Sequence, residues 1–252
     1  MLDQSVNLVV ITVAAFAGGL LNALAGGGSF FTLPALVFSG VPPVVANATG
    51  TTALLPGYLA SAWSGREFIR SPAGLSVLLV VMLGAIGGTL GAMLLLVSSN
   101  EAFSLIVPWL LLFATLLFAF GPRLHGLLVA KPRRGGPFWG RAGIIGVSLY
   151  GGYFNGGMGI VILAAVRLMG VHDLNAANAL KNLLSAVLTL VAVVVYAMGG
   201  LVSWLQVLPM AVAASAGGVL GVTIGRRVHP AALRAFIVIV GAATTLVFFL
   251  RT

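Results

Sequence analysis

Ten runs of apolar residues divide this chain, and polar residues, glycine or proline separate each run from the next. The runs cover residues 6–25, 30–38, 44–63, 75–97, 103–120, 142–150, 158–169, 174–198, 204–224 and 233–250. A helix needs about 20 apolar residues to cross a bilayer. Three runs in each half are long enough or nearly so, whereas 30–38 and 158–169 are too short to cross unaided. The pattern therefore predicts half-helices or re-entrant hairpins at these two places.

The second half of the chain repeats the first at an offset of 130 to 133 residues. Paired glycines followed by asparagine, an Ala-Asn-Ala triplet and a Gly-Gly-x-x-Gly pattern recur in the same order. The matched positions are Gly18, Gly19 and Asn22 with Gly151, Gly152 and Asn155, Gly40-Val41 with Gly170-Val171, Ala46-Asn47-Ala48 with Ala177-Asn178-Ala179, and Gly87, Gly88 and Gly91 with Gly217, Gly218 and Gly221. These matches predict an internal duplication: a first repeat at 1–121, a basic linker at 122–141 and a second repeat at 142–252.

Composition decides which class of protein these runs build. Hydrophobic residues make up 60% of the chain and charged residues 7%, and the mean hydropathy is +1.15. A soluble domain needs far more charge on its outer faces, so we expect a polytopic membrane protein. The absence of cysteine excludes disulfides, thiolate metal sites and a cysteine nucleophile.

The chain has 13 Lys and Arg against 4 Asp and Glu, which gives a net charge of +9. Most of the basic residues lie in short connections between the runs. There they interact with lipid headgroups and set the topology, so we expect no nucleic-acid partner. Arg66, Arg70, Arg226 and Arg227 mark inside loops, as does the linker, whereas the uncharged or acidic loops at 98–101 and 199–203 are outside. Matched loops thus fall on opposite sides, which predicts an inverted repeat with one site at mid-membrane and both termini outside.

Lys181 is the most informative charged residue. It lies roughly 10 Å into the run that begins at Leu174, where a cation is costly unless it is paired or faces water. One interpretation is that Lys181 extends to the membrane interface or pairs with Asp173. The other is that it binds an anion, and we favour this second interpretation. Asp173 itself is expected to cap a helix. His172 is expected to be a polar turn residue, and Arg167 either snorkels or adds positive potential to the site.

Two polar sets accompany Lys181, one in each half. Both hold asparagine beside glycines where a helix can unwind, so that freed N–H groups and amides reach a ligand. The sets are Asn22, Asn47, Thr49, Thr51 and Thr52 in the first half, and Asn155, Asn178 and Asn182 in the second. Interhelical hydrogen bonding is the alternative for any one of them. The Gly87 and Gly217 groups are expected to pack helices closely, within a subunit or in a homodimer.

No pair of acids lies within an apolar run, and no phosphate-binding loop or metal-ligand cluster is present. We therefore expect no enzyme, no ATP-driven pump and no cofactor.

The segments 25–36 (AGGGSFFTLPAL), 46–52 (ANATGTT), 151–160 (GGYFNGGMGI) and 175–185 (NAANALKNLLS) together resemble the sulfite exporter TauE/SafE-like permeases. The resemblance covers nearly the whole chain. It implies a multi-pass inner (plasma) membrane permease for a small anion, often sulfite or an organosulfur acid such as sulfoacetate. The positions that match the family motifs, and so are expected to bind substrate, are Asn22, Gly27, Gly28, Asn47, Thr51, Asn155, Gly157, Asn178, Lys181 and Asn182.

We thus predict an all-α polytopic membrane protein of two inverted-topology repeats with broken or re-entrant helices and eight to ten membrane segments. Its predicted function is secondary transport of a small anion by alternating access. A passive anion channel is the alternative.

Overall fold

The computed structural model describes residues 4–72, 75–129, 137–171, 173–225 and 230–250. Over these ranges the chain forms ten α-helices and one short 3-10 helix, without a strand, which confirms the all-α prediction. The helices are α1 (Gln4–Ala25), α2 (Ser29–Phe38), α3 (Pro43–Ser64), η1 (Arg66–Phe68), α4 (Val77–Val97), α5 (Asn100–Val129), α6 (Pro137–Tyr153), α7 (Met158–Leu168), α8 (Leu174–Met198), α9 (Trp204–Gly225) and α10 (Pro230–Phe249).

Helix boundaries follow the apolar runs closely except around the linker. α8 covers the same residues as its run, and its N-cap is Asp173, whose Oδ1 accepts a hydrogen bond from the Ala176 amide at 2.7 Å, as predicted. α5 continues through Pro122 to Val129. α6 begins with Pro137 at its first position, where the N–H that proline lacks would have no partner within the helix. Helix therefore enters the predicted linker from both sides. Lys131, His172, Arg226 and Arg227 lie outside the described residues.

Five helices in the described part of the chain are long and apolar enough to cross a membrane. These spans are Ser5–Leu24, Val77–Val97, Asn100–Gly121, Leu174–Met198 and Trp204–Gly221. Their outer faces expose large apolar side chains such as Leu78, Val97, Val212 and Val219, which suits lipid rather than water. The protein is therefore a multi-pass membrane protein. α3 has 22 residues but carries buried threonines and Asn47, because it lies inside the bundle.

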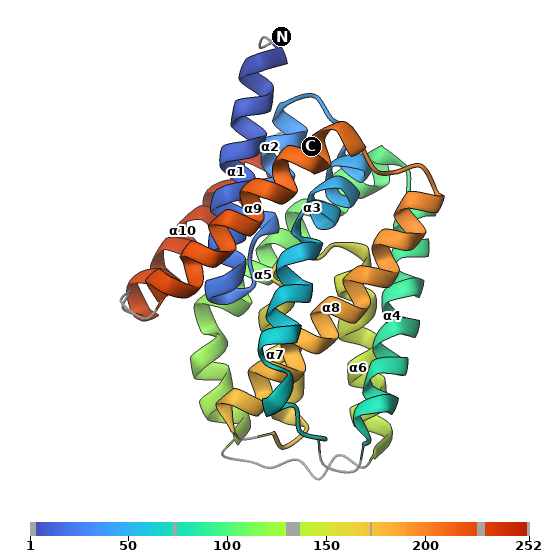
Figure 1. Cartoon of the computed structure of the whole chain (residues 1–252), viewed down its shortest axis with the longest axis vertical. Helices are drawn as coiled ribbons and strands as arrows, with labels where there is room; N and C mark the ends of the chain where they lie inside the picture. Colours follow the sequence, from blue (N-terminus) through green and yellow to red (C-terminus); the bar gives the residue numbers. More distant parts are fainter. Residues whose placement is uncertain (1–3, 73–74, 130–136, 172, 226–229, 251–252) are drawn as a thin grey trace.

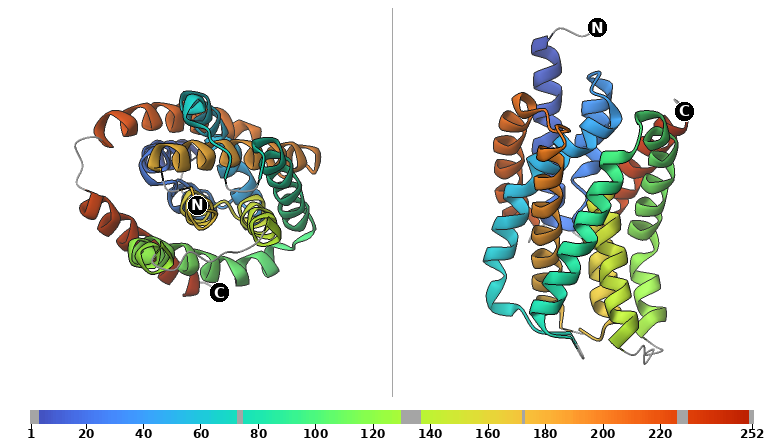
Figure 2. Two further views of the ribbon diagram at one scale, coloured as in Figure 1. Left: turned by 90° about the horizontal axis from the view of Figure 1, so that it is seen from below. Right: turned by 90° about the vertical axis from the view of Figure 1, so that its right-hand side faces the viewer.

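The two short runs form the half-helices that their length predicts. α2 has 10 residues and α7 has 11. In Figure 1, α1 descends from the end at which the chain starts and α2 returns to that end, whereas α6 and α7 form a hairpin that opens at the opposite end. The two hairpins thus enter the bundle from opposite ends. Figure 2 shows that the start of α1 and the end of α10 lie at the same end of the molecule.

Helix packing is related between the two halves. If α1 to α5 are matched in order with α6 to α10, each main pairing has a counterpart: α1 with α9 and α6 with α4, α3 with α9 and α8 with α4, α2 with α10 and α7 with α5. α3 packs on its counterpart α8, and α5 on its counterpart α10. Both half-helices also end alike, at Gly40 with φ +88° and Gly170 with φ +87°. The main pairings of the first half thus recur in the second, and the inverted repeat stays a prediction.

The glycine patterns lie where these helices approach closely. A Cβ on Gly87 would lie 2.6 Å from the Ile145 carbonyl oxygen of α6, and a Cβ on Gly221 would lie 2.7 Å from the Leu20 carbonyl oxygen of α1. Gly88 and Gly152 also face each other closely. The close-packing interpretation is confirmed, and the contacts that these glycines make lie within one chain.

Candidate functional site

Each half of the chain has one break between a long helix and a half-helix. The first break, residues 26–28, lies between α1 and α2, and Gly26 there has a φ of +82°. The second break, residues 154–157, lies between α6 and α7 and contains Asn155 at φ +62° and Gly157 at φ +65°. Asn155 is the single non-glycine residue with positive φ in the described ranges. Asparagine adopts the left-handed region more readily than other non-glycine residues, and residues held there concentrate at functional sites.

The two breaks meet inside the bundle. A Cβ on Gly26 would lie 2.8 Å from the Cα of Gly159 in the first turn of α7, so the backbones of the two hairpins touch. A Cβ on Gly28 would lie 2.7 Å from the Gly18 carbonyl oxygen and 2.9 Å from the Leu54 side chain. Side chains larger than hydrogen do not fit at either position. The glycines of both breaks are buried, so this conformation closes the region to solvent.

Tyr58 of α3 lies against Asn155 of the second break and Asn22 in the last turn of α1. Its hydroxyl donates a hydrogen bond to the Asn155 Oδ1 at 3.2 Å, and the Asn22 side chain lies within hydrogen-bonding reach of the same hydroxyl. Tyr58 is 5% exposed and Asn155 is 1% exposed. The structure therefore brings Asn22 and Asn155 together around a residue that the sequence did not single out.

Both half-helices begin at this meeting point, and neither has a side-chain cap. Gly28 and Gly157 occupy the N-cap positions of α2 and α7 without capping hydrogen bonds. The amides of Gly27, Gly28, Gly156 and Gly157 also make no hydrogen bond within the part of the chain described. Two sets of free N–H groups and two positive helix ends thus converge, which is the arrangement that binds an anion.

Further polar atoms near the breaks are buried without a partner. Leaving such an atom unpaired costs about 1–3 kcal/mol. In and beside the breaks they are Asn22 Oδ1, Ser29 Oγ, Thr32 Oγ1, Thr51 Oγ1 and Asn155 Nδ2, and on α8 they are Ser185 Oγ and Thr189 Oγ1. A ligand or ordered water between the hairpins would satisfy them.

Asn47 links α3 to α6 by a side-chain hydrogen bond. Its Nδ2 donates to the Tyr153 carbonyl oxygen at 2.9 Å, at the last residue of α6, and its side chain is buried. Asn47 therefore ties α3 to the start of the second break. This is interhelical hydrogen bonding, which the sequence left open as the alternative.

Lys181 lies beside the breaks rather than in them. Asn182 of α8 donates to the Ser61 carbonyl oxygen of α3 at 3.4 Å, and α3 and α8 run in opposite directions (Figure 1). Tyr58 on α3 is consequently level with Ser185 on α8, and Lys181 is one helical turn away, about 6 Å along the axis. Lys181 is half-buried and makes no ion pair or hydrogen bond with any residue that the structure describes.

The remaining candidates are less central. Asn178, one turn before Lys181, is exposed at the start of α8, and Asn182 is half-buried. Arg167 lies in the last turn of α7, about 13 Å along that helix from its first residue. Arg167 therefore lies at the far end of the half-helix from the breaks.

Side chains hold the second break in place. Tyr150 donates its hydroxyl to the Gly156 carbonyl oxygen at 2.5 Å, and Tyr196 of α8 donates to the Gly152 carbonyl oxygen. With Tyr58 and the Asn47 contact, hydrogen bonds from three helices fix this segment. Sequence reasoning missed the tyrosines, although a signal exists on α8. Asn178, Lys181, Asn182, Ser185, Thr189 and Tyr196 recur at helical spacing and form one polar stripe along that helix.

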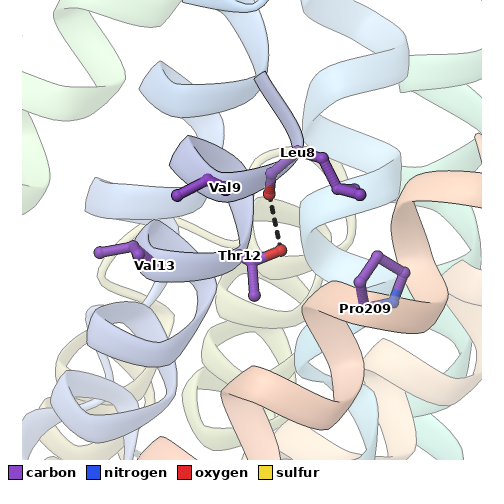
Figure 3. Close-up of a pocket in the computed structure, with 5 residues that line it drawn as sticks. All are labelled: Leu8, Val9, Thr12, Val13 and Pro209. Atoms are coloured by element: carbon purple, nitrogen blue, oxygen red, sulfur yellow. Dashed lines mark hydrogen bonds between the residues drawn. The ribbon is translucent and has the colours of Figure 1, made fainter. Parts of the chain in front are cut away.

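A surface groove lies away from this region. Leu8, Val9, Thr12 and Val13 of α1 line it with Pro209 of α9 (Figure 3). Its lining is almost wholly aliphatic, and the Thr12 hydroxyl is bonded to the Leu8 carbonyl oxygen at 2.7 Å. The groove has no charge or free donor for an anion, so it is not the candidate site.

Comparison with known proteins supports a transport role. The sequence model of the family described as sulfite exporter TauE/SafE matches residues 11–248. A probable membrane transporter protein of Haemophilus influenzae is 28% identical over 236 residues, covering 87% of this chain and 84% of the relative. The probable membrane transporter protein YfcA of Escherichia coli K12 is 29% identical over 237 residues, covering 93% and 87%. A probable membrane transporter protein, ORF9, of a Sinorhizobium species is 30% identical over 173 residues, covering 67% and 64%. No solved structure matches the chain.

Proposed function

Because this chain belongs to the sulfite exporter TauE/SafE family, we propose that it is a secondary transporter of a small sulfur oxyanion, either sulfite or an organosulfur acid such as sulfoacetate, in the inner membrane. That the chain is a membrane transporter follows from the family and from its relatives. The substrate and the mechanism are the proposal.

One observation carries this proposal: the uncapped N-termini of α2 and α7 meet at the contact between Gly26 and Gly159. Each helix end carries about half a positive charge together with free N–H groups. Opposed half-helices at mid-membrane are how several secondary transporters hold the charged group of a substrate. The free amide nitrogen of Asn155 adds a side-chain donor at the same place.

Lys181 supplies the full counter-charge in this proposal. Without a partner, a cation in the membrane interior costs at least about 2.5 kcal/mol. A bound anion offsets that cost, and Lys181 in turn offsets the cost of removing the anion from water. The lysine is one turn from the level of Tyr58, so the anion would lie between the Lys181 ammonium and the two helix ends.

Alternating access would come from movement of one hairpin against the other. We propose that the α1–α2 hairpin enters the membrane from outside and the α6–α7 hairpin from the cytoplasm, as two inverted copies of one unit. The described conformation is closed, since Asn155 is 1% exposed. A carrier passes through such closed states, and this favours a carrier over a continuously open channel.

The test is uptake of radiolabelled sulfite into proteoliposomes by wild type and by Lys181→Ala. Loss of a charged hydrogen-bonding partner lowers the apparent substrate affinity or turnover by roughly 10- to 100-fold. Asn175→Ala is the matched control, because Asn175 is an exposed residue in the first turn of the same helix. Size-exclusion profiles show whether each variant is folded.

Full activity of a folded Lys181→Ala protein would remove the lysine from the mechanism. Flux that never saturates, or unitary currents in a planar bilayer, would establish a channel in place of a carrier. Mass spectrometry of the transported anion separates transport from catalysis, since a transporter returns its substrate chemically unchanged.

A further inference from the structure

The hydrogen bonds around Tyr58 restrict what the asparagines can offer to a ligand. A tyrosine hydroxyl has one proton to donate. Tyr58 donates it to Asn155 Oδ1 at 3.2 Å, and the Asn22 amide lies beside the same oxygen. Asn22 therefore meets Tyr58 with its nitrogen, as a donor. The three side chains form a single directed series: Asn22 amide, Tyr58 hydroxyl, Asn155 carbonyl.

This series leaves one polar atom of each asparagine amide without a hydrogen bond, and one of these atoms is a donor whereas the other is an acceptor. Asn155 retains its Nδ2 donor and Asn22 retains its Oδ1 acceptor, and both atoms are buried without a partner. If both amides were turned over, the free donor would belong to Asn22 and the free acceptor to Asn155. In either arrangement the Tyr58 hydroxyl donates one hydrogen bond and accepts one. The pair therefore presents one donor and one acceptor.

The acceptor is informative because an anion without hydrogen has nothing to offer it. Sulfate and the sulfite dianion would place an oxygen with full lone pairs against a buried carbonyl oxygen, which leaves both unsatisfied. An anion that carries its own hydrogen would donate it to the amide oxygen. The same anion would receive hydrogen bonds from the amide nitrogen and from the N–H groups at the two helix ends.

The charge around the breaks agrees with a single negative charge. Of the charged groups on the packed helices, Lys181 lies one turn from the level of Tyr58, whereas Arg167 lies at the far end of α7. Asp173 caps α8, and Arg66 and Glu67 are exposed on η1, which packs against α3 and α8. One cation near the site neutralises a monoanion, while a dianion would leave uncompensated charge in the membrane interior.

From these two observations we infer that the site selects a singly charged oxyanion bearing one hydrogen-bond donor, as hydrogensulfite does in its hydroxyl form. This inference rests on the proposed function. Tyr58 is then a positioning residue: it fixes which end of each amide faces the ligand and so sets selectivity.

The experiment measures competition against labelled sulfite in proteoliposomes, with methanesulfonate as a monoanion lacking a donor and sulfate as a dianion. Hydrogensulfite should bind about 10- to 100-fold more tightly than either competitor. The apparent KM for total sulfite should rise about tenfold for each pH unit above the pKa of hydrogensulfite, since the monoanion fraction falls by that factor. Methanesulfonate does not titrate in this range, so its inhibition constant reports any pH effect on the protein itself.

Tyr58→Phe tests the positioning role. It frees both amides to turn, and the ratio of methanesulfonate to hydrogensulfite affinity should move toward one. Tyr153→Phe is the control, because that hydroxyl lies 3.5 Å from Ser98 Oγ and is hydrogen-bonded to neither asparagine. A purely structural role for Tyr58 would change stability or rate and leave the ratio unaltered.

The inference is overturned by a KM for total sulfite that does not change with pH, by methanesulfonate or sulfate binding as tightly as hydrogensulfite, or by an unchanged ratio in Tyr58→Phe. Saturable sulfite transport would survive each of these outcomes, and with it the proposed function. Absence of saturable uptake of any tested anion would instead reject the proposed function.

Discussion

Substitution of Gly87 by alanine tests the packing that holds the two halves together. Gly87 lies on α4 against α6, and a Cβ there would lie 2.6 Å from the Ile145 carbonyl oxygen and 2.8 Å from the Ser148 Cβ. Both obstacles belong to the backbone or its first side-chain atom, so neither can rotate away. An ordinary contact begins near 3.4 Å, so α4 and α6 must separate locally by about 0.8 Å.

The magnitude follows from the cost of overpacking. Forcing a methyl group into a close-packed interface costs about 1–3 kcal/mol. Gly146 provides the control, because it follows Ile145 on α6 and a Cβ there meets no atom within 4 Å. Alanine at Gly146 should stabilise the helix by about 0.5–1 kcal/mol. Gly87→Ala gains the same helix propensity, so the two variants should differ by the overpacking cost alone, about 1–3 kcal/mol in free energy of unfolding.

Thermal unfolding of purified protein in detergent, followed by tryptophan fluorescence, measures this difference. At about 2–4 °C per kcal/mol for a chain of this size, Gly87→Ala should unfold about 2–12 °C below Gly146→Ala. Gly217→Ala at the matching position of α9 should behave like Gly87→Ala, since a Cβ there would collide with the Phe16 backbone. Equal midpoints for Gly87→Ala and Gly146→Ala would show that α4 and α6 are not in contact as described.

Three further predictions follow from the breaks and the topology. Asn155→Gly should fold like wild type but lose transport, whereas Asn155→Ala should in addition lose about 1–2 kcal/mol because alanine disfavours a φ of +62°; transport and melting assays on both variants separate the backbone from the amide. Tyr196→Phe should lower stability by about 1–3 kcal/mol, because it leaves the buried Gly152 carbonyl without its partner, and an unchanged melting midpoint would contradict this. Single cysteines in this cysteine-free chain should react with a membrane-impermeant maleimide on intact cells at Ser99→Cys, and at Ser71→Cys after permeabilisation alone; the reverse pattern would invert the proposed orientation.

The positions and lengths of most helices could be predicted from the sequence, because each signal lies within the segment that it describes. The glycines at 26–28 and the shortness of the run at 30–38 are enough to predict a half-helix, since neither depends on distant residues. Asp173 before an apolar run predicts its cap for the same reason. The linker at 122–141 was predicted from its basic, proline- and glycine-rich composition, which does not specify where α5 ends at Val129.

The contacts of the candidate site depend on how helices cross, which no local pattern specifies. Asn47 matches the family motif, but its partner, the Tyr153 carbonyl, is 106 residues away in sequence. Tyr58 is one aromatic residue in a run of apolar ones, and it becomes informative when α3 crosses both breaks. The grouping of Asn22 with Asn155 was expected from the duplication, whereas the residue that joins them was not.

The two breaks differ in a way that bears on which hairpin moves. In the second break the Gly156 carbonyl oxygen accepts a hydrogen bond from Tyr150, and just before it the Gly152 and Tyr153 carbonyl oxygens accept from Tyr196 and Asn47. In the described residues of the first break, the glycines make close backbone contacts, and no side chain donates to their carbonyl oxygens. Backbone contact between glycines can slide at little cost, whereas moving the second break would expose several buried carbonyls at about 1–3 kcal/mol each. If access alternates by movement of one hairpin, we therefore expect α1–α2 to move and α6–α7 to stay, with the contact between Tyr58 and Asn22 broken and that between Tyr58 and Asn155 kept.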